Sequence, residues 1–270
     1  MKIAFIGGGN MATALIAGLA KQLDERERIL VVDPNSDALA RLETDYGVDT
    51  APGIDDRIGA CQIIVLAVKP QQMREVAAAL APHVQSQLVL SIAAGIRSAD
   101  LSRWLGGYGV IVRAMPNTPA LIGMGITGMV AMAGVNATQR ADAVGVMRAV
   151  GQTVWLDDEA LIDPVTAVSG SGPAYVFYFL EAMQAAATEM GLSAEQGKEL
   201  ALATFAGATQ LALQSDESLE TLRQRVTSKG GTTHAAITSM EGAGVKQAII
   251  EAMKAAAARG RELGDELGAD

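Results

Sequence analysis

The sequence predicts an α/β protein in which a doubly wound sheet occupies residues 1–160 and an all-helical domain occupies residues 161–270. Three observations lead to this expectation. Short apolar segments alternate with helical segments over the first half of the chain, and a glycine-rich turn follows the first apolar segment. No segment with the two-residue period of a strand follows Leu161. Buried strands separated by helices are typical of a parallel sheet with helices on both faces.

The composition of the 270 residues excludes several classes of protein. Half of the residues are hydrophobic and 19% are charged, which excludes intrinsic disorder. A formal net charge of −9, without a basic stripe, argues against nucleic acid as a partner. One cysteine and two distant histidines predict neither a disulfide nor a metal site, and they favour a reducing, cytoplasmic location.

Residues 114–139 carry no charge and exceed the roughly 20 residues that span a bilayer. Pro116, Pro119 and several glycines interrupt the segment. Lipid offers no hydrogen-bond partner for the backbone groups that such a sequence leaves free. We therefore expect a buried strand–loop–strand region here and no membrane as a partner.

A glycine-rich turn follows the first expected strand, Lys2–Ile6. Residues 7–12 read GGGNMA, which matches G-x-G-x-x-A, and a helix rich in small residues follows. Gly7 permits the tight turn, Gly9 removes a Cβ that would block a pyrophosphate, and Ala12 lets the helix pack closely on the strand. The helix start offers free N–H groups. This pattern is typical of a Rossmann-type dinucleotide-binding domain; the alternative is a βα turn that binds no ligand.

A second expected strand, Ile29–Val32, ends at Asp33. An acid about 20 residues beyond the glycine turn accepts a ribose hydroxyl, which favours NAD and repels a 2′-phosphate. Asn35 and Ser36 could still receive a phosphate. The choice between NADH and NADPH therefore stays open at this point.

The remaining elements follow in order along the chain. The pattern predicts strands over residues 63–68, 88–92, 110–114 and 153–156, and helices over residues 36–46, 71–80, 138–150, 172–190, 194–214, 218–226 and 244–267. Three of these strands end in loops of small, polar or proline residues, at 69–70, 93–95 and 115–119. Ligands sit outside the carboxyl ends of strands in such sheets, so these loops are expected to wall a nicotinamide pocket; ordinary turn chemistry is the alternative.

The alanine-rich helical half needs a partner surface, which predicts a dimerisation and substrate domain. Its most informative segment is residues 226–234, which read VTSKGGTTH. Here one helix ends, two glycines free the backbone, and the next helix begins behind threonines. The exposed N–H groups and hydroxyls suit a small carboxylate. A capped helix–helix turn is an equal alternative.

Several motifs make the chain resemble the pyrroline-5-carboxylate reductase family. The most specific is VTSKGGTTHAAI at residues 226–237, although many members carry proline where this chain has Lys229. The supporting motifs occur in the family's order: FIGGGNM at 5–11, AVKP at 67–70, SIAAG at 91–95, RAMPNTP at 113–119 and VSGSGPAY at 168–175.

The resemblance implies an NAD(P)H-dependent reduction of Δ1-pyrroline-5-carboxylate to L-proline, the last step of proline biosynthesis. NADPH is the expected coenzyme, with NADH as the other candidate. Members of the family pair through the helical domain, and some stack dimers into decamers. Each active site then combines the coenzyme of one subunit with the glycine–threonine loop of its neighbour.

The pattern and the resemblance together predict the site residues. The Thr233 hydroxyl is expected to hydrogen-bond to the ring nitrogen of the imine, and Glu159 to face the cationic ring. The predicted substrate-binding residues are Val226, Ser228, Gly230, Gly231, Thr232, Thr233 and Glu159. The predicted coenzyme-binding residues are Ile6, Gly7, Gly8, Gly9, Asn10, Met11, Asp33, Asn35, Ser36, Ala67, Val68, Lys69, Pro70, Ala93, Ala94, Gly95 and Asn117.

Two other function classes remain as alternatives. A β-hydroxyacid dehydrogenase also has a Rossmann half followed by helices, but it would be expected to use a lysine in its first long C-terminal helix. Residues 172–190 contain no lysine. A non-catalytic NAD(P)-sensing protein would keep the glycine turn and lose the loop of residues 226–234, which this chain keeps. Consumption of NAD(P)H with pyrroline-5-carboxylate distinguishes these classes from the predicted reductase.

Overall fold

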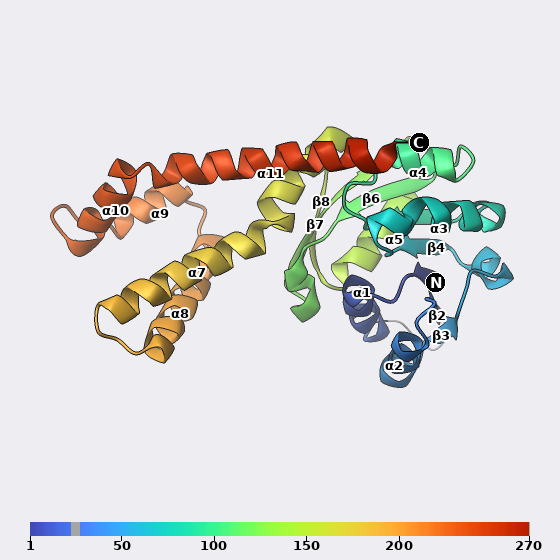
Figure 1. The fold of residues 1–270 in the computed structure, drawn as a ribbon, viewed down its shortest axis with the longest axis horizontal. Coiled ribbons are helices and arrows are strands. Elements are labelled where there is room, and N and C mark those ends of the chain that lie inside the picture. Colours follow the sequence, from blue (N-terminus) through green and yellow to red (C-terminus); the bar gives the residue numbers. More distant parts are fainter. Residues whose placement is uncertain (23–27, 270) are drawn as a thin grey trace. The chain divides into compact units, whose positions relative to one another are not determined.

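The computed structural model describes residues 1–22 and 28–269, and its central feature is an eight-stranded sheet. The strands, in order across the sheet, are β3 (Asp49–Ala51), β2 (Arg28–Val32), β1 (Lys2–Ile6), β4 (Ile63–Leu66), β5 (Leu88–Ser91), β6 (Ile111–Met115), β7 (Gly125–Ala131) and β8 (Gly151–Trp155) (Figure 1). The first six run parallel, in the order of a Rossmann-type sheet. β7 runs antiparallel to β6, and β8 runs parallel to β7. The predicted doubly wound sheet is confirmed.

Helices cover both faces of the sheet because its central strands bury side chains on both sides. In β1, Ile3 and Phe5 join one hydrophobic cluster, and Ala4 and Ile6 join another. The first cluster includes side chains of α1 (Asn10–Ala20), α2 (Ser36–Tyr46) and α5 (Ala137–Arg148). The second includes side chains of α3 (Met73–Leu80) and α4 (Ser98–Trp104). This alternation follows from the two-residue period of a strand.

Most of the helix ends lie where local sequence signals predict them. The Asn35 side chain accepts hydrogen bonds from the N–H groups of the first turn of α2, and Gly47 ends that helix with a φ of 65°. Ser193 and Gln196 form the capping box that begins α8 (Ala194–Leu213). Such caps satisfy N–H groups that have no partner inside the helix.

The chain forms two compact units. The sheet unit contains residues 1–171 together with residues 255–270, and the helical unit contains residues 172–254. The helical unit holds α7 (Gly172–Glu189), α8, α9 (Leu219–Arg225), α10 (Thr232–Gly242) and the first part of α11 (Val245–Gly268). α7 and α8 lie side by side (Figure 1). The contacts thus divide the chain after Ser171 and return the end of α11 to the sheet unit, which differs from the expected boundary at residue 160.

Some elements differ from the expected ones because their local signal is weak. β3 has three residues, too few to show a period, and neither it nor α4 was expected. The strand expected over residues 63–68 ends at Leu66, and the helix expected from residue 71 begins as a 3₁₀ turn. The charge-free segment contains β7, which confirms a strand–loop–strand region. A short helix, α6 (Ile162–Val165), and a π-helical turn over Thr166–Gly170 precede α7. Across the described ranges, none of the helices is both long enough and apolar enough to cross a bilayer.

Gly18 sits where α1 meets the end of α5. A Cβ at Gly18 would lie 2.4 Å from the carbonyl oxygen of Ala149. We expect Gly18→Ala to lower the free energy of unfolding by about 1–3 kcal/mol, because overpacking against backbone outweighs the better helix propensity of alanine. Urea unfolding measures this change.

Gly145 in α5 provides the matched control, because a Cβ built there meets no atom within 4 Å apart from its chain neighbours and the backbone of its own helix. Gly145→Ala should raise the free energy of unfolding by about 0.5–1 kcal/mol. Equal stabilities of the two variants would contradict the close approach at Gly18.

Candidate active site

The carboxyl ends of β1, β2, β4, β5 and β6 lie at one edge of the sheet, because these strands run parallel. The loops that follow them contain the predicted coenzyme-binding residues: 6–11, 33–36, 67–70, 93–95 and 117. The strand order reverses between β1 and β4, and ligands bind at such a switch point in open α/β sheets. The topology therefore gathers these loops at the position where a dinucleotide is expected.

The glycine turn has the shape that a pyrophosphate requires. Gly7 has a φ of 102°, and a Cβ there would lie 2.7 Å from the Ala67 carbonyl oxygen, so only glycine fits. Gly9 is the N-cap of α1 and gives no side-chain cap, and a Cβ built on it meets no atom within 4 Å apart from its chain neighbours. The N–H groups of the first turn of α1 thus receive no hydrogen bond from an N-cap side chain. This cradle fits the diphosphate of a dinucleotide.

The Asp33 carboxylate connects the glycine turn to the loop that follows β2. The Gly8 N–H donates to Oδ2 at 2.7 Å, and the Asn35 N–H donates to Oδ1 at 2.8 Å. The carboxylate is therefore held beside the turn, where an acid accepts a ribose hydroxyl in related folds. The amide oxygen of Asn35 is already used to cap α2, which leaves Ser36 as the exposed hydroxyl of this loop.

The loops after β4 and β5 differ in exposure. Lys69 is exposed at the start of a 3₁₀ turn. Ala93 is buried and Ala94 is exposed, and the turn that they begin continues through Gly95, whose φ is 76°. The loop after β5 thus exposes backbone and the small side chain of Ala94 at this edge of the sheet.

The Asn117 side chain forms hydrogen bonds with two backbone segments, one of which lies just before the helical unit. It is 9% exposed; its Nδ2 donates to the Ser169 carbonyl at 3.1 Å, and its Oδ1 accepts from the Ile126 N–H at 3.0 Å. Ser169 lies in the π-helical turn. The contacts of Asn117 are therefore structural, and a contact with the coenzyme remains a prediction.

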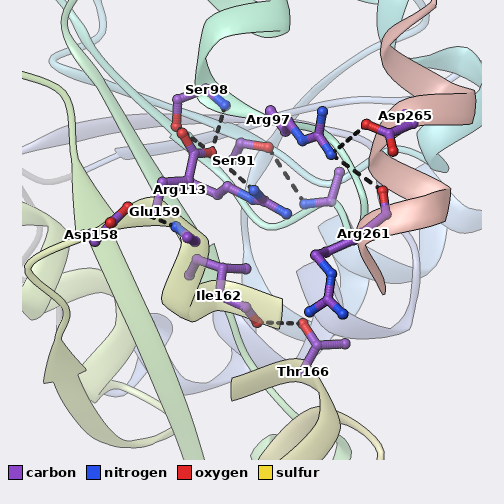
Figure 2. Close-up of polar contacts among 12 residues, drawn as sticks. Ser91, Arg97, Ser98, Arg113, Asp158, Glu159, Ile162, Thr166, Arg261 and Asp265 are labelled. Atoms are coloured by element: carbon purple, nitrogen blue, oxygen red, sulfur yellow. Dashed lines mark hydrogen bonds and ion pairs between the residues drawn. The ribbon is translucent and has the colours of Figure 1, made fainter. Parts of the chain in front are cut away.

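Glu159 lies in a polar cluster that sequence reasoning did not find (Figure 2). Its Oε1 accepts hydrogen bonds from the Ser98 N–H at 2.7 Å and the Ser98 hydroxyl at 3.0 Å, and it pairs with the Arg113 guanidinium at 2.9 Å. Arg113 is only 5% exposed. The available signal was an arginine inside a strand otherwise made of apolar residues, since a buried charge requires a partner.

The loop of residues 226–234 joins α9 to α10 in the helical unit. Gly230 has a φ of 77°, and Gly231 is the N-cap of α10 without a side-chain cap. The Gly231 N–H, expected to hold a carboxylate, donates instead to the Ser228 carbonyl at 3.0 Å. The N–H groups of Thr232 and Thr233 lie in the first helical turn, where a helix offers no internal partner. Val226 is exposed at the start of the loop.

Thiol chemistry has no support at Cys61. Burial raises the pKa of the Cys61 thiol, so the thiol stays protonated at neutral pH. In the part of the chain that the structure describes, no group of three histidine, cysteine or acidic side chains gathers as a metal site would require.

The open space at Gly9 yields a prediction that separates binding from folding. Gly9 has an ordinary φ of −71°, so Gly9→Ala should leave the free energy of unfolding unchanged within about 0.5 kcal/mol. The added methyl group would occupy the pyrophosphate position and raise the Kd for NADPH at least about tenfold. Fluorescence titration with NADPH measures the Kd. Unchanged affinity in the folded variant would contradict a dinucleotide at this turn.

Comparison with known proteins agrees with this geometry. Residues 2–95 match the family model described as NADP oxidoreductase coenzyme F420-dependent, and residues 159–263 match the model described as pyrroline-5-carboxylate reductase dimerisation. The chain is 46% identical over 268 residues to a pyrroline-5-carboxylate reductase of Pseudomonas aeruginosa, with 99% of this chain and 98% of that protein covered. The corresponding enzyme of Haemophilus influenzae is 42% identical, with 97% of each chain covered.

Similar solved structures include enzymes of the same kind. A pyrroline-5-carboxylate reductase from Coxiella burnetii matches with a TM-score of 0.90 and 41% identity, with 97% of each chain covered. A pyrroline carboxylate reductase of Plasmodium falciparum, solved with NADP bound, matches with a TM-score of 0.85 and 29% identity, with 98% of each chain covered. A 3-hydroxyisobutyrate dehydrogenase of Mycobacterium tuberculosis shares the fold alone, at 15% identity, with a TM-score of 0.52 over 71% of this chain and 66% of that one. The chain belongs to the pyrroline-5-carboxylate reductase family.

Proposed function

We propose that the sheet unit holds NADPH and that the loop of residues 226–234 holds the substrate, each at a helix start without a side-chain cap. The reaction follows from the family: the chain is an NAD(P)H-dependent oxidoreductase that reduces Δ1-pyrroline-5-carboxylate to L-proline, the last step of proline biosynthesis. The observation that carries the site assignment is the N-cap of α1 and of α10: both helices begin at a glycine, Gly9 and Gly231, which has no side chain to cap them. Several other helices are capped by a side chain at this position, namely that of Asn35, Asn136, Ser193 or Ser218.

The residues at the edge of the sheet would hold the coenzyme in three parts. The first turn of α1 would bind the diphosphate through backbone N–H groups, and Asp33 would face the adenosine ribose. The loops of residues 67–70 and 93–95 would flank the nicotinamide. The bound coenzyme supplies the hydride for the reaction.

The substrate loop would act by position and hydrogen bonding. The N–H groups of Thr232 and Thr233 would hold the substrate carboxylate at the start of α10. The half-buried Thr233 would place its hydroxyl on the ring nitrogen and keep the imine protonated. A protonated imine is a better hydride acceptor, so orientation and exclusion of water supply much of the catalysis.

The helical unit exposes apolar surface that a second subunit would cover. Of the 20 residues of α8, only Gly197 and Ala201 are buried, and α10 buries none of its residues. A groove of about 460 Å³ opens between α9, α10 and α11 and is lined mainly by apolar side chains: Phe179, Leu219, Ile237, Met240, Ile249 and Ile250. A helix in a folded assembly normally buries one face. The protein is an oligomer, and we propose a homodimer through this unit, with decamers as stacked dimers.

The proposal also covers the cellular compartment and the preferred coenzyme of the protein. We propose the cytoplasm, which the single, unpaired Cys61 supports, because disulfides are typical of oxidising compartments. NADPH is the proposed coenzyme, with NADH as the alternative that the Asp33 carboxylate favours.

Thr233 tests the proposed chemistry. Thr233→Ala should lower kcat/KM for pyrroline-5-carboxylate by about 10²–10⁴, because the hydroxyl takes part in proton transfer. NADPH oxidation at the nicotinamide absorbance band measures the rate, and Thr233→Ser, which keeps the hydroxyl, should retain most of it. A loss below about threefold in folded Thr233→Ala protein would remove this residue from the mechanism.

Mixed oligomers test whether neighbouring subunits share each site. Gly9→Ala chains supply an intact substrate loop, and Thr233→Ala chains supply an intact coenzyme site. If each site combines the two, random pairing on co-expression should restore about one quarter of the wild-type activity. If each subunit uses its own loop, every site carries a defect, and activity should stay at the level of the two parent variants.

A further inference from the structure

We propose that Glu159 is a positioning residue of the coenzyme site, which holds the loop of residues 92–97, between β5 and α4, in its binding conformation. This inference rests on the proposed function, because it takes Ala93–Gly95 to face the nicotinamide. It assigns Glu159 a different role from the substrate contact expected from the resemblance. Arg97 and Ser98, where the loop meets α4, make the contacts that hold it.

Glu159 fixes the end of the loop at α4. α4 begins at Ser98, its N-cap residue Arg97 provides no side-chain cap, and the Ser98 N–H donates to Glu159 Oε1 instead. The same oxygen accepts the Ser98 hydroxyl. Glu159 is thus a helix cap supplied from 61 residues away in the chain. Without it, the first N–H of α4 would lose its partner and the loop could leave its present path.

The ion pair with Arg113 explains why the cap is a carboxylate. Arg113 Nη1 lies 2.9 Å from Glu159 Oε1, and the Arg113 side chain is 6% exposed. A buried guanidinium without a partner would destabilise the fold strongly. Arg113 also belongs to β6, next to β5 in the sheet. Glu159 therefore connects the loop to the rigid sheet.

The end of α11 holds Arg97, the residue before Ser98. Arg97 Nη2 pairs with Asp265 Oδ1 at 2.7 Å and donates to the Arg261 carbonyl at 3.2 Å (Figure 2). A Cβ on Gly264 would lie 3.0 Å from the Arg97 guanidinium, so the glycine lets Arg97 lie close against the helix. The loop is therefore anchored to α11 as well as to Glu159.

The turn of Ala94 and Gly95, which precedes these anchors in the loop, is the part that would meet the coenzyme. Gly95 has a φ of 76°, and a Cβ there would lie 2.9 Å from Leu267 Cδ1. Exposed Ala94 precedes it. When a loop populates its binding conformation only part of the time, the apparent Kd rises by the inverse of that fraction. Loss of Glu159 should therefore weaken coenzyme binding and leave substrate binding nearly unchanged.

The test compares Glu159→Ala and Glu159→Gln with wild type. Glu159→Ala should raise the Kd for NADPH, titrated by fluorescence without substrate, by about tenfold, with Glu159→Gln in between because it keeps one oxygen for Ser98. Hydrogen exchange of amides 93–98 in coenzyme-free protein should quicken in the same order. The KM for pyrroline-5-carboxylate at saturating NADPH should stay within about twofold. Glu266→Ala, which removes the exposed ion pair of α11 with Arg259, is the matched control and should change none of these values.

Two outcomes would overturn the proposal. A raised KM for pyrroline-5-carboxylate with unchanged NADPH affinity would make Glu159 a substrate contact. A lowered Tm with unchanged Kd and unchanged exchange would make the cluster purely structural. If Glu159→Ala fails to fold, Ser98→Ala removes the hydroxyl bond alone, and with Glu159→Gln it should give the same pattern more weakly. Wild-type protein that neither binds NADPH nor reduces pyrroline-5-carboxylate would contradict the proposed function itself. Failure of the proposed function can therefore be distinguished from failure of the Glu159 proposal, which only the variants test.

Discussion

The starts of α1 and α10, which no N-cap side chain covers, are the constraint on which the proposed site depends. A helix leaves its first N–H groups without internal partners, and the loss of a cap costs about 0.5–2 kcal/mol. Side chains of Asn35, Asn136 and Ser193 satisfy this need in α2, α5 and α8. α1 and α10 instead begin at Gly9 and Gly231 without a side-chain cap. Helix starts of this kind can bind anions, and we propose a diphosphate at α1 and a carboxylate at α10.

The sheet holds the first of these starts in the shape that the proposed dinucleotide site requires. Because β1 and β4 are neighbours, the turn at Gly7 passes against the Ala67 carbonyl, and any side chain at Gly7 would collide with it. Asp33, at the end of β2, takes the Gly8 N–H and ties the turn to the neighbouring strand. The proposed diphosphate position, the proposed ribose acceptor and the following loops are thus held by one rigid layer.

The walls of the site depend on contacts between distant parts of the chain. Glu159 caps α4 and neutralises Arg113, and Arg97 joins the same loop to the end of α11. Asn117 similarly connects the loop after β6 to the π-helical turn. These four side chains can affect coenzyme binding without touching the coenzyme. Each decides where a backbone segment of the site lies, which is how supporting residues control a binding site.

By itself, the sequence determined the features that local chemistry controls: the strand of residues 2–6 with its glycine turn, the helix stop at Gly47 and the capping box at Ser193. These follow from periodicity, backbone freedom and caps within a few residues. Only the tertiary structure decided that β7 runs antiparallel to β6, that the Gly231 N–H is already used, and that Glu159 meets Ser98 and Arg113. The reason is physical: periodicity shows which face of an element is buried, but not which buried charge meets which partner across 46 or 61 residues of chain.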